Sequence, residues 1–228
     1  MSTYDADYEF DLDVDLPDEA LRANPEPRCQ VAIVLDVSAS MAGEPLAALQ
    51  DGLALLLDEI RNDPLARQRC EIAIITFGGS VKVVQDFATC DNIDLPRLSA
   101  QGNTPMGAGI AAGLDALTER RRILRQNGIE RYRPWLFLIT DGMATDDIAQ
   151  SARRLREAAE DGRLVCFGVG INDADMERLS EIMPTPPKKL RGLAFSELFA
   201  WLSASMRSVS RSQVGEQVRL PAIGWEVV

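Results

Sequence analysis

Short apolar runs alternate with longer amphipathic segments between residue 30 and residue 209. Uninterrupted apolar runs of strand length are typical of strands buried on both faces of a parallel sheet, with helices covering those faces. The pattern therefore predicts an α/β fold with a mostly parallel central sheet. Strands are expected at residues 30–36, 71–77, 81–84, 135–140 and 163–169, and helices at 45–61, 107–126, 145–161, 174–182 and 195–209.

Two local patterns refine this expectation. The stretch EIAIITFGGSVKVV holds two strand-like runs joined by Gly78 and Gly79, which predicts a tight turn and one antiparallel edge strand. The stretch GAGIAAG at 107–113 lies on a predicted helix, where its small residues favour close packing. The last predicted helix places a row of apolar side chains on one face: Phe195, Leu198, Phe199, Leu202, Met206 and Val209.

Residues 1–28 form an acidic tail and linker before the predicted domain at 29–209, and 210–228 form a C-terminal extension. From Tyr4 to Leu16 the tail alternates apolar and acidic residues. This period of two fits an extended strand with one apolar face, an acidic segment that becomes ordered on a partner, or a solubilising arm. A calcium loop is excluded, because Leu16 and Arg22 stand where glycine and glutamate are needed.

The net charge of −11 is unevenly distributed along the 228 residues. Residues 1–20 hold eight acids and no Lys or Arg, so the remaining chain carries only −3. No basic groove is indicated, and ERRRILR at 119–125 is expected to be a solvated helix face, so nucleic-acid binding is not expected. No apolar run approaches the roughly 18 residues of a membrane helix, and the acidic N-terminus is not a signal peptide, so a cytoplasmic protein without membrane insertion is expected.

The residue types present restrict the chemistry. The chain has no histidine, which excludes Ser-His-Asp triads, histidine acid–base catalysis and histidine-ligated zinc. The four cysteines are scattered, without C-x-x-C spacing, and Cys166 lies in an apolar run where burial is expected. A Rossmann-type or P-loop nucleotide site is also excluded, because the first strand leads into DVSASMAGEP instead of a glycine-rich phosphate loop.

Oxygen-bearing side chains follow two predicted strands and one loop. Asp36, Ser38 and Ser40 follow the first strand in VAIVLDVSAS, and Asp141 follows the strand at 135–140. In open parallel sheets, ligands bind beyond the carboxyl ends of the strands where the strand order reverses. If those two strands are neighbours, both Asp residues meet there, with Thr104 of GNTPMGAG nearby. Taken singly, these residues could be helix caps or turn residues, but together their hard oxygen atoms favour Mg²⁺, with Mn²⁺ or Ca²⁺ as alternatives.

These residues resemble the metal-ion-dependent adhesion site (MIDAS) of von Willebrand factor A (vWA) domains. DVSAS resembles the D-x-S-x-S motif, TPMGAG the threonine loop and ITDG the second aspartate loop. The resemblance covers residues 29–209. It implies a Rossmann-like vWA fold with strand order 3-2-1-4-5-6, and it implies that Asp36, Ser38, Ser40, Thr104 and Asp141 hold the ion directly or through water.

A narrower resemblance is to bacterial TerY-like proteins of tellurium-resistance and stress clusters. It is carried by LDVSASMAGEPLAALQDGL, RPWLFLITDG and FSELFAWLSASMRSVSRS, and by a strand-like end, VRLPAIGWEV. Such proteins are encoded beside Ser/Thr kinases and PP2C-type phosphatases, which the resemblance implies as partners. The acidic tail departs from that family's pattern.

The resulting hypothesis is a non-enzymatic, Mg²⁺-dependent protein-binding scaffold in a stress-response, tellurite-resistance or defence system. Its metal would capture a Glu or Asp carboxylate of a partner protein. The alternatives are a metal-dependent hydrolase, for which no general base stands near the motif, and a subunit of an ATPase- or chelatase-type complex.

Overall fold

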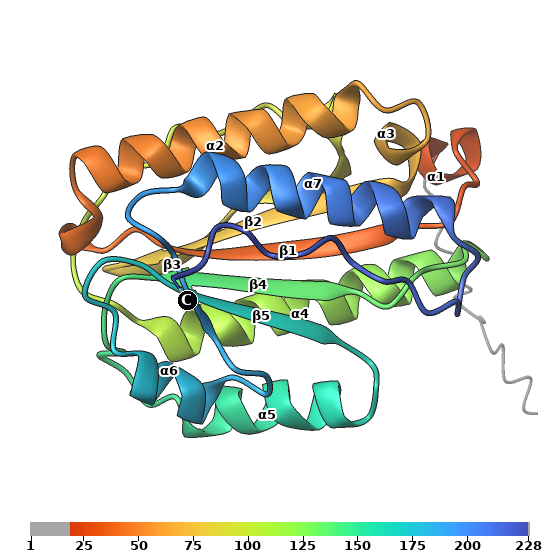
Figure 1. Cartoon of the computed structure of the whole chain (residues 1–228). Coiled ribbons are helices and arrows are strands. Elements are labelled where there is room, and N and C mark those ends of the chain that lie inside the picture. The colour runs from red at the N-terminus through yellow and green to blue at the C-terminus, as the bar shows by residue number, and fades with distance from the viewer. Residues whose placement is uncertain (1–18, 228) are drawn as a thin grey trace, which may run out of the picture.

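Six strands form one sheet in the order β3-β2-β1-β4-β5-β6 in the computed structural model, which describes residues 19–227 (Figure 1). The order and the directions confirm the predicted fold, a mostly parallel sheet with one antiparallel edge strand. The parallel strands are β1 (Cys29–Asp36), β2 (Cys70–Gly78), β4 (Trp135–Thr140), β5 (Val165–Gly170) and β6 (Lys188–Lys189), and β3 (Ser80–Thr89) is antiparallel to β2.

Helices cover both faces of the sheet (Figure 1). One face is covered by α2 (Glu44–Arg61) and α7 (Phe195–Arg211), with the short α3 (Ala66–Arg69) beside them. The other face is covered by α4 (Met106–Gln126), α5 (Ala149–Glu160) and α6 (Met176–Ile182). A short helix, α1 (Glu19–Ala23), precedes β1, and single 3₁₀ turns occur at Ala39–Met41 and Cys90–Asn92.

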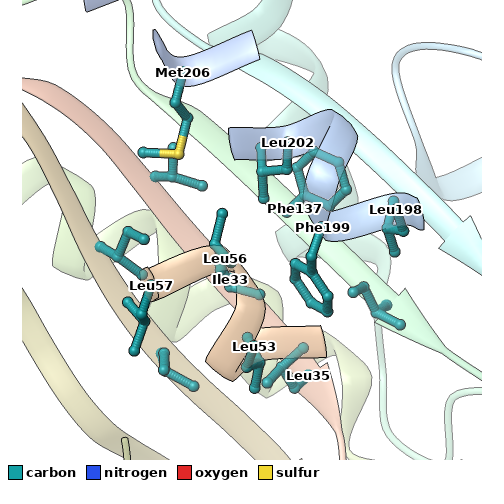
Figure 2. Close-up of a cluster of buried hydrophobic side chains, with 14 of the residues drawn as sticks. Ile33, Leu35, Leu53, Leu56, Leu57, Phe137, Leu198, Phe199, Leu202 and Met206 are labelled. Carbon is teal, nitrogen blue, oxygen red and sulfur yellow. The ribbon is translucent and has the colours of Figure 1, made fainter. Parts of the chain in front are cut away.

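The two faces of β1 contribute to separate apolar clusters. Ile33 and Leu35 pack with side chains of α2, α7 and β4, which Figure 2 shows as one continuous cluster. Ala32 and Val34 point to the α4 side. The predicted apolar row on the last helix is confirmed, because all six of its residues are buried. Because both of its faces are covered, every residue of β1 is buried, as expected for a central strand.

Glycines permit close contact between helices and sheet. A Cβ atom on Gly109 of α4 would lie 2.7 Å from the Phe77 ring, and one on Gly113 would lie 2.8 Å from Val34 Cγ2. On the other face, a Cβ atom on Gly52 of α2 would lie 2.6 Å from the Phe199 ring of α7. The predicted packing role of GAGIAAG is thus confirmed.

Several boundaries differ from those predicted. Strand β3 continues to Thr89 instead of ending at 84, and α5 begins at Ala149 because an acidic loop fills 145–148. The strand-like end VRLPAIGWEV is not a regular strand: within the described residues it forms the isolated bridge between Leu190 and Glu226. Pro221 has no N–H for a strand ladder, and its carbonyl instead accepts a hydrogen bond from Trp201 Nε1 at 2.9 Å. The alternating tail pattern lies outside the described residues.

The solvated-face prediction for 119–125 is wrong for one residue. Arg120 Nη2 lies 2.6 Å from Glu71 Oε1, and Arg28 Nε lies 3.0 Å from the same oxygen. The side chains of Glu71 and Arg28 are almost fully buried. Burial lowers the pKa of Arg28, while the neighbouring Glu71 opposes this shift. The guanidinium of Arg28 also donates to the carbonyls of Asn24 and Glu26, so this part of the predicted tail and linker, residues 1–28, is attached to the domain.

The chemistry of the remaining core is simple. All four cysteines are buried and free, which confirms the prediction for Cys166. Burial raises the pKa of both Cys90 and Cys166 to about 12. Within residues 19–227, no helix combines the length and the apolar character that crossing a membrane requires.

Replacing Glu71 by alanine is expected to lower the free energy of unfolding by about 3–5 kcal/mol, because two arginines, one of them buried, lose their shared carboxylate. Urea unfolding followed by circular dichroism measures this change. Glu119→Ala is the matched control, since its pair with Arg122 is exposed to solvent and should contribute little to stability. Equal effects of the two substitutions would show that the buried cluster is not stabilising.

Candidate metal centre

Asp36 is the last residue of β1, and its side chain is fully buried. Its Oδ1 atom accepts a hydrogen bond from the backbone N–H of Ser38 at 2.9 Å. Its Oδ2 atom accepts one from Thr140 Oγ1, at the end of β4, at 2.6 Å. The carboxylate is therefore held in one orientation by groups from two adjacent strands.

Ser38, Ser40 and Asp141 continue from Asp36 as a chain of hydrogen bonds. The hydroxyl oxygens of Ser38 and Ser40 lie 3.0 Å apart, and Ser40 Oγ donates to Asp141 Oδ1 at 2.8 Å. Ser38 is buried, Asp141 is half-buried and Ser40 is exposed, so the chain runs from the interior to the surface. Side chains that are 101 residues apart in the sequence meet at this edge of the sheet.

Thr104 approaches the same place from the loop before α4. A Cβ atom on Gly142 would lie 3.4 Å from Thr104 Oγ1 and 3.9 Å from Asp36 Oδ2, so both oxygens border the small space that Gly142 leaves open. The carbonyl of Thr104 accepts from Thr145 N at 2.9 Å, which ties this loop to the one after β4. All five sequence-predicted residues are thus gathered beyond the carboxyl ends of β1 and β4.

Close backbone contacts fix the loops that carry these residues. A Cβ atom on Gly78 would lie 2.3 Å from the carbonyl oxygen of Val37, and one on Gly102 would lie 2.4 Å from Gly79 Cα. Ala39 N donates to the carbonyl of Gly102 at 3.0 Å. The loop after β1, the β2–β3 turn and the loop before α4 therefore contact one another directly.

Two supporting residues were not predicted from the sequence. Thr140 holds Asp36, and Asp146 accepts hydrogen bonds from the backbone N–H groups of Gly107 and Ala108 at 2.9 and 2.8 Å. Asp146 thereby caps the start of α4 just after Thr104. The role of Thr140 could have been inferred from its position directly before Asp141. The Asp146 cap of α4 joins residues 39 apart, so it leaves no local sequence pattern.

The two carboxylates have no positive partner in the part of the chain that the structure describes. No Lys or Arg within residues 19–227 forms an ion pair with Asp36 or Asp141. Burial raises the pKa of Asp36, and the neighbouring Asp141 adds to the shift, whereas hydrogen bonds from Ser38 and Thr140 oppose it. A buried carboxylate beside a second one is unfavourable without a cation.

A groove of about 570 Å³ lies beside these carboxylates. Asn172, at its rim, has a φ of 49°, a backbone conformation that asparagine tolerates better than most residues. Lys189 contributes a positive charge to the groove. The groove is lined by Ser40, Asp141, Asn172, Asp173, Lys189, Leu190, Gly192 and Val227.

The donor set fits a hard divalent cation. Two carboxylates and three hydroxyls supply oxygen atoms alone, the ligand type of Mg²⁺, Mn²⁺ and Ca²⁺. The described residues form no cluster of three or more His, Cys, Asp or Glu side chains, so no nitrogen- or sulfur-rich metal site competes with it. A bound cation would balance the two unpaired carboxylates.

Comparison with known proteins places these features in a family. The sequence profile of the von Willebrand factor type A domain matches residues 30–197. An uncharacterized protein of Synechocystis sp. is 25% identical over 148 residues, which cover 63% of this chain and 32% of that protein. The chain therefore spans about a third of this curated relative.

Solved structures share the fold at low sequence identity. The pilus adhesin SpaC of Lactobacillus rhamnosus GG superposes with a TM-score of 0.59 and 15% identity, covering 81% of this chain and 30% of that one. Proximal thread matrix protein 1 of the mussel byssus, in a structure with a zinc-occupied MIDAS motif, gives 0.53 and 14%, covering 80% and 48%. Since the profile covers more than half of the chain and the strand order and site geometry agree with it, this chain belongs to the von Willebrand factor type A domain family.

Proposed function

We propose that this protein is a non-catalytic binding module whose affinity for a protein partner depends on a divalent cation, Mg²⁺ in the first instance. The observation that carries the proposal is the continuous hydrogen-bonded row from buried Asp36 through Ser38 and Ser40 to Asp141, which has two carboxylates and no cationic partner among the described residues. The row opens into the groove that Ser40 and Asp141 line.

Each residue has a defined task in this proposal. Asp36 and Asp141 supply the negative charge, and Ser38, Ser40 and Thr104 supply neutral oxygens. Thr140 keeps Asp36 in position, as residues behind a metal ligand commonly do. A divalent cation held by this set would provide a coordination position for one further carboxylate, from a Glu or Asp of the partner.

The groove favours an acidic partner segment. Its volume of about 570 Å³ accommodates a few side chains, and Lys189 lies within it without an ion pair among the described residues. A second acidic group of the partner could therefore contact Lys189.

The biological setting rests on sequence resemblance. The stretches that resemble TerY-like proteins are the support for a bacterial tellurium-resistance, stress or defence role in the cytoplasm, with a Ser/Thr kinase or a PP2C-type phosphatase as partner. A hydrolase is the less favoured alternative, because the chain has no histidine and both oxygens of the Asp36 carboxylate already accept hydrogen bonds.

Mg²⁺ is expected to stabilise the wild-type protein against urea, by about 2.7 kcal/mol at a concentration 100 times the Kd, because the cation binds only the folded site. Asp36→Asn keeps the shape of the side chain but removes the charge, so this stabilisation should vanish. Isothermal titration calorimetry gives the Kd independently. Asp58→Asn, on the exposed side of α2, is the control and should retain the full effect. Stabilisation that persists in Asp36→Asn would contradict the assignment.

Thr140→Val should weaken Mg²⁺ binding about 10- to 100-fold, because Asp36 loses the hydroxyl that orients it. Titration calorimetry measures the change, and circular dichroism checks that the fold persists. Thr118→Val, which removes only a hydroxyl bonded to a carbonyl within α4, should leave the affinity unchanged. Equal affinities of wild type and Thr140→Val would exclude the orienting role.

Partner capture tests the binding function itself. Tagged wild-type protein in Mg²⁺, the same protein in EDTA, and Asp36→Asn in Mg²⁺ are incubated with lysate, and captured proteins are identified by mass spectrometry. We expect at least one partner protein to be captured only by the wild-type protein in Mg²⁺. Replacing the acidic residues of that partner should abolish its capture. A partner set indifferent to metal and to Asp36 would refute metal-dependent binding, and metal-dependent phosphatase or nuclease turnover would favour the hydrolase.

A further inference from the structure

A cluster of arginines lies at the opposite end of the sheet from the candidate metal centre. It is built from the end of α4, the segment before β4 and the turn before β5, at the end of the molecule where α1 lies (Figure 1). Four arginines line a pocket of about 410 Å³, and Arg125 lies close to one of them. We call this surface the arginine face; it comprises Arg121, Arg125, Arg131, Arg133 and Arg163.

The charges of this face are not balanced by the described residues. Of the five arginines of this face, only Arg163 forms an ion pair within residues 19–227, with Asp161. Glu130 is the one acid that lines the pocket. Burial lowers the pKa of Arg131, and the nearby Arg121 and Arg125 lower it further. Guanidinium groups thus crowd together where repulsion disfavours them, an arrangement that an anionic ligand would relieve.

An apolar groove continues from the arginine face. It has a volume of about 470 Å³ and shares Tyr132 and Arg133 with the arginine pocket. Its walls include Trp135, Val165 and Leu220. The combined surface therefore presents positive charge beside apolar side chains, which suits a ligand that is both acidic and apolar.

The chain itself contains such a ligand. Residues 1–18 hold seven acids and no Lys or Arg, and apolar residues alternate with them from Tyr4 to Leu16. The described chain begins beside the arginine face, because Leu21 of α1 packs against Leu124 and Ile129. Eighteen residues can extend to about 60 Å at 3.3 Å or more per residue, which exceeds the roughly 30 Å diameter of a small domain.

We propose that the acidic segment 1–18 docks on the arginine face of its own chain, with its carboxylates against the arginines and its apolar residues in the adjoining groove. Three observations carry the proposal. The acidic segment is opposite in charge to the arginine face, its alternating apolar residues suit the adjoining apolar groove, and α1 lies beside this face. The metal centre is not involved, so docking should not depend on Mg²⁺.

Paramagnetic relaxation in the full-length protein tests this docking. A nitroxide label on Thr3→Cys is selective, because the four native cysteines are buried. The backbone amide signals of Gly162 and Val214, which line the pocket, should lose intensity at 0.01 M salt and regain it at 1 M, where the Debye length falls from about 30 Å to about 3 Å. The reversal R121E/R131E/R133E should abolish the loss.

The control R97E/R153E/R178E changes the net charge equally at exposed positions outside the arginine face and should retain the loss. Salt dependence in the labelled wild type supplies the same information if the triple reversal fails to fold. The proposal would be overturned if the Gly162 and Val214 signals lost no intensity at low salt, or lost it equally in both triple variants. Broadening transferred from a labelled ¹⁴N copy to an unlabelled ¹⁵N copy would also overturn it, by showing that the segment binds a second molecule.

Discussion

The parallel pairing of β1 with β4 is the contact on which the candidate metal centre depends. Its register sets Leu35 opposite Ile139, so that Asp36 lies beside Thr140 and one residue from Asp141. The two strands are separated in the sequence by α2, α3, β2, β3 and α4, and the central position of β1 in the sheet brings them together. The apolar side chains on both faces of β1 hold this register, because a shift by one residue would exchange the side chains that pack in the two clusters.

Unpaired charge lies at both ends of the sheet, with opposite sign. Among residues 19–227, the carboxylates of Asp36 and Asp141 beyond the carboxyl ends of the strands have no cationic partner, and of the arginine face near the amino ends only Arg163 has an acidic one. Between them, the buried charged cluster around Glu71 is internally paired and serves stability. Charges balanced within the described fold thus belong to its architecture, whereas unbalanced charges indicate where something else can bind.

Much of the fold and of the candidate site could be predicted, because both depend on local patterns joined by one topological rule. Strands buried on both faces leave apolar runs, and the strand-end rule places Asp36 and Asp141 together once β1 and β4 are neighbours. Features that depend on long-range contacts left no such pattern. The role of Arg120 depends on Glu71, 49 residues away, and the cap from Asp146 on α4 depends on a tertiary contact. The irregular C-terminal segment is held by the contact between Trp225 and Trp201 and by a single bridge to Leu190, which are long-range contacts as well.

The close backbone contacts at Gly78, Gly79 and Gly102 have a consequence for how quickly the candidate metal centre can bind an ion. Ordering a flexible loop costs about 1–2 kcal/mol per residue in conformational entropy, but the close backbone contacts among these three loops leave them little freedom to lose. Capture of a cation then requires only small side-chain movements and the removal of water from the ion, a step that Mg²⁺ undergoes reluctantly. The speed of loading would thus be set by the hydration chemistry of the ion and not by folding of the loops, so that ions which exchange water faster would load sooner at equal affinity.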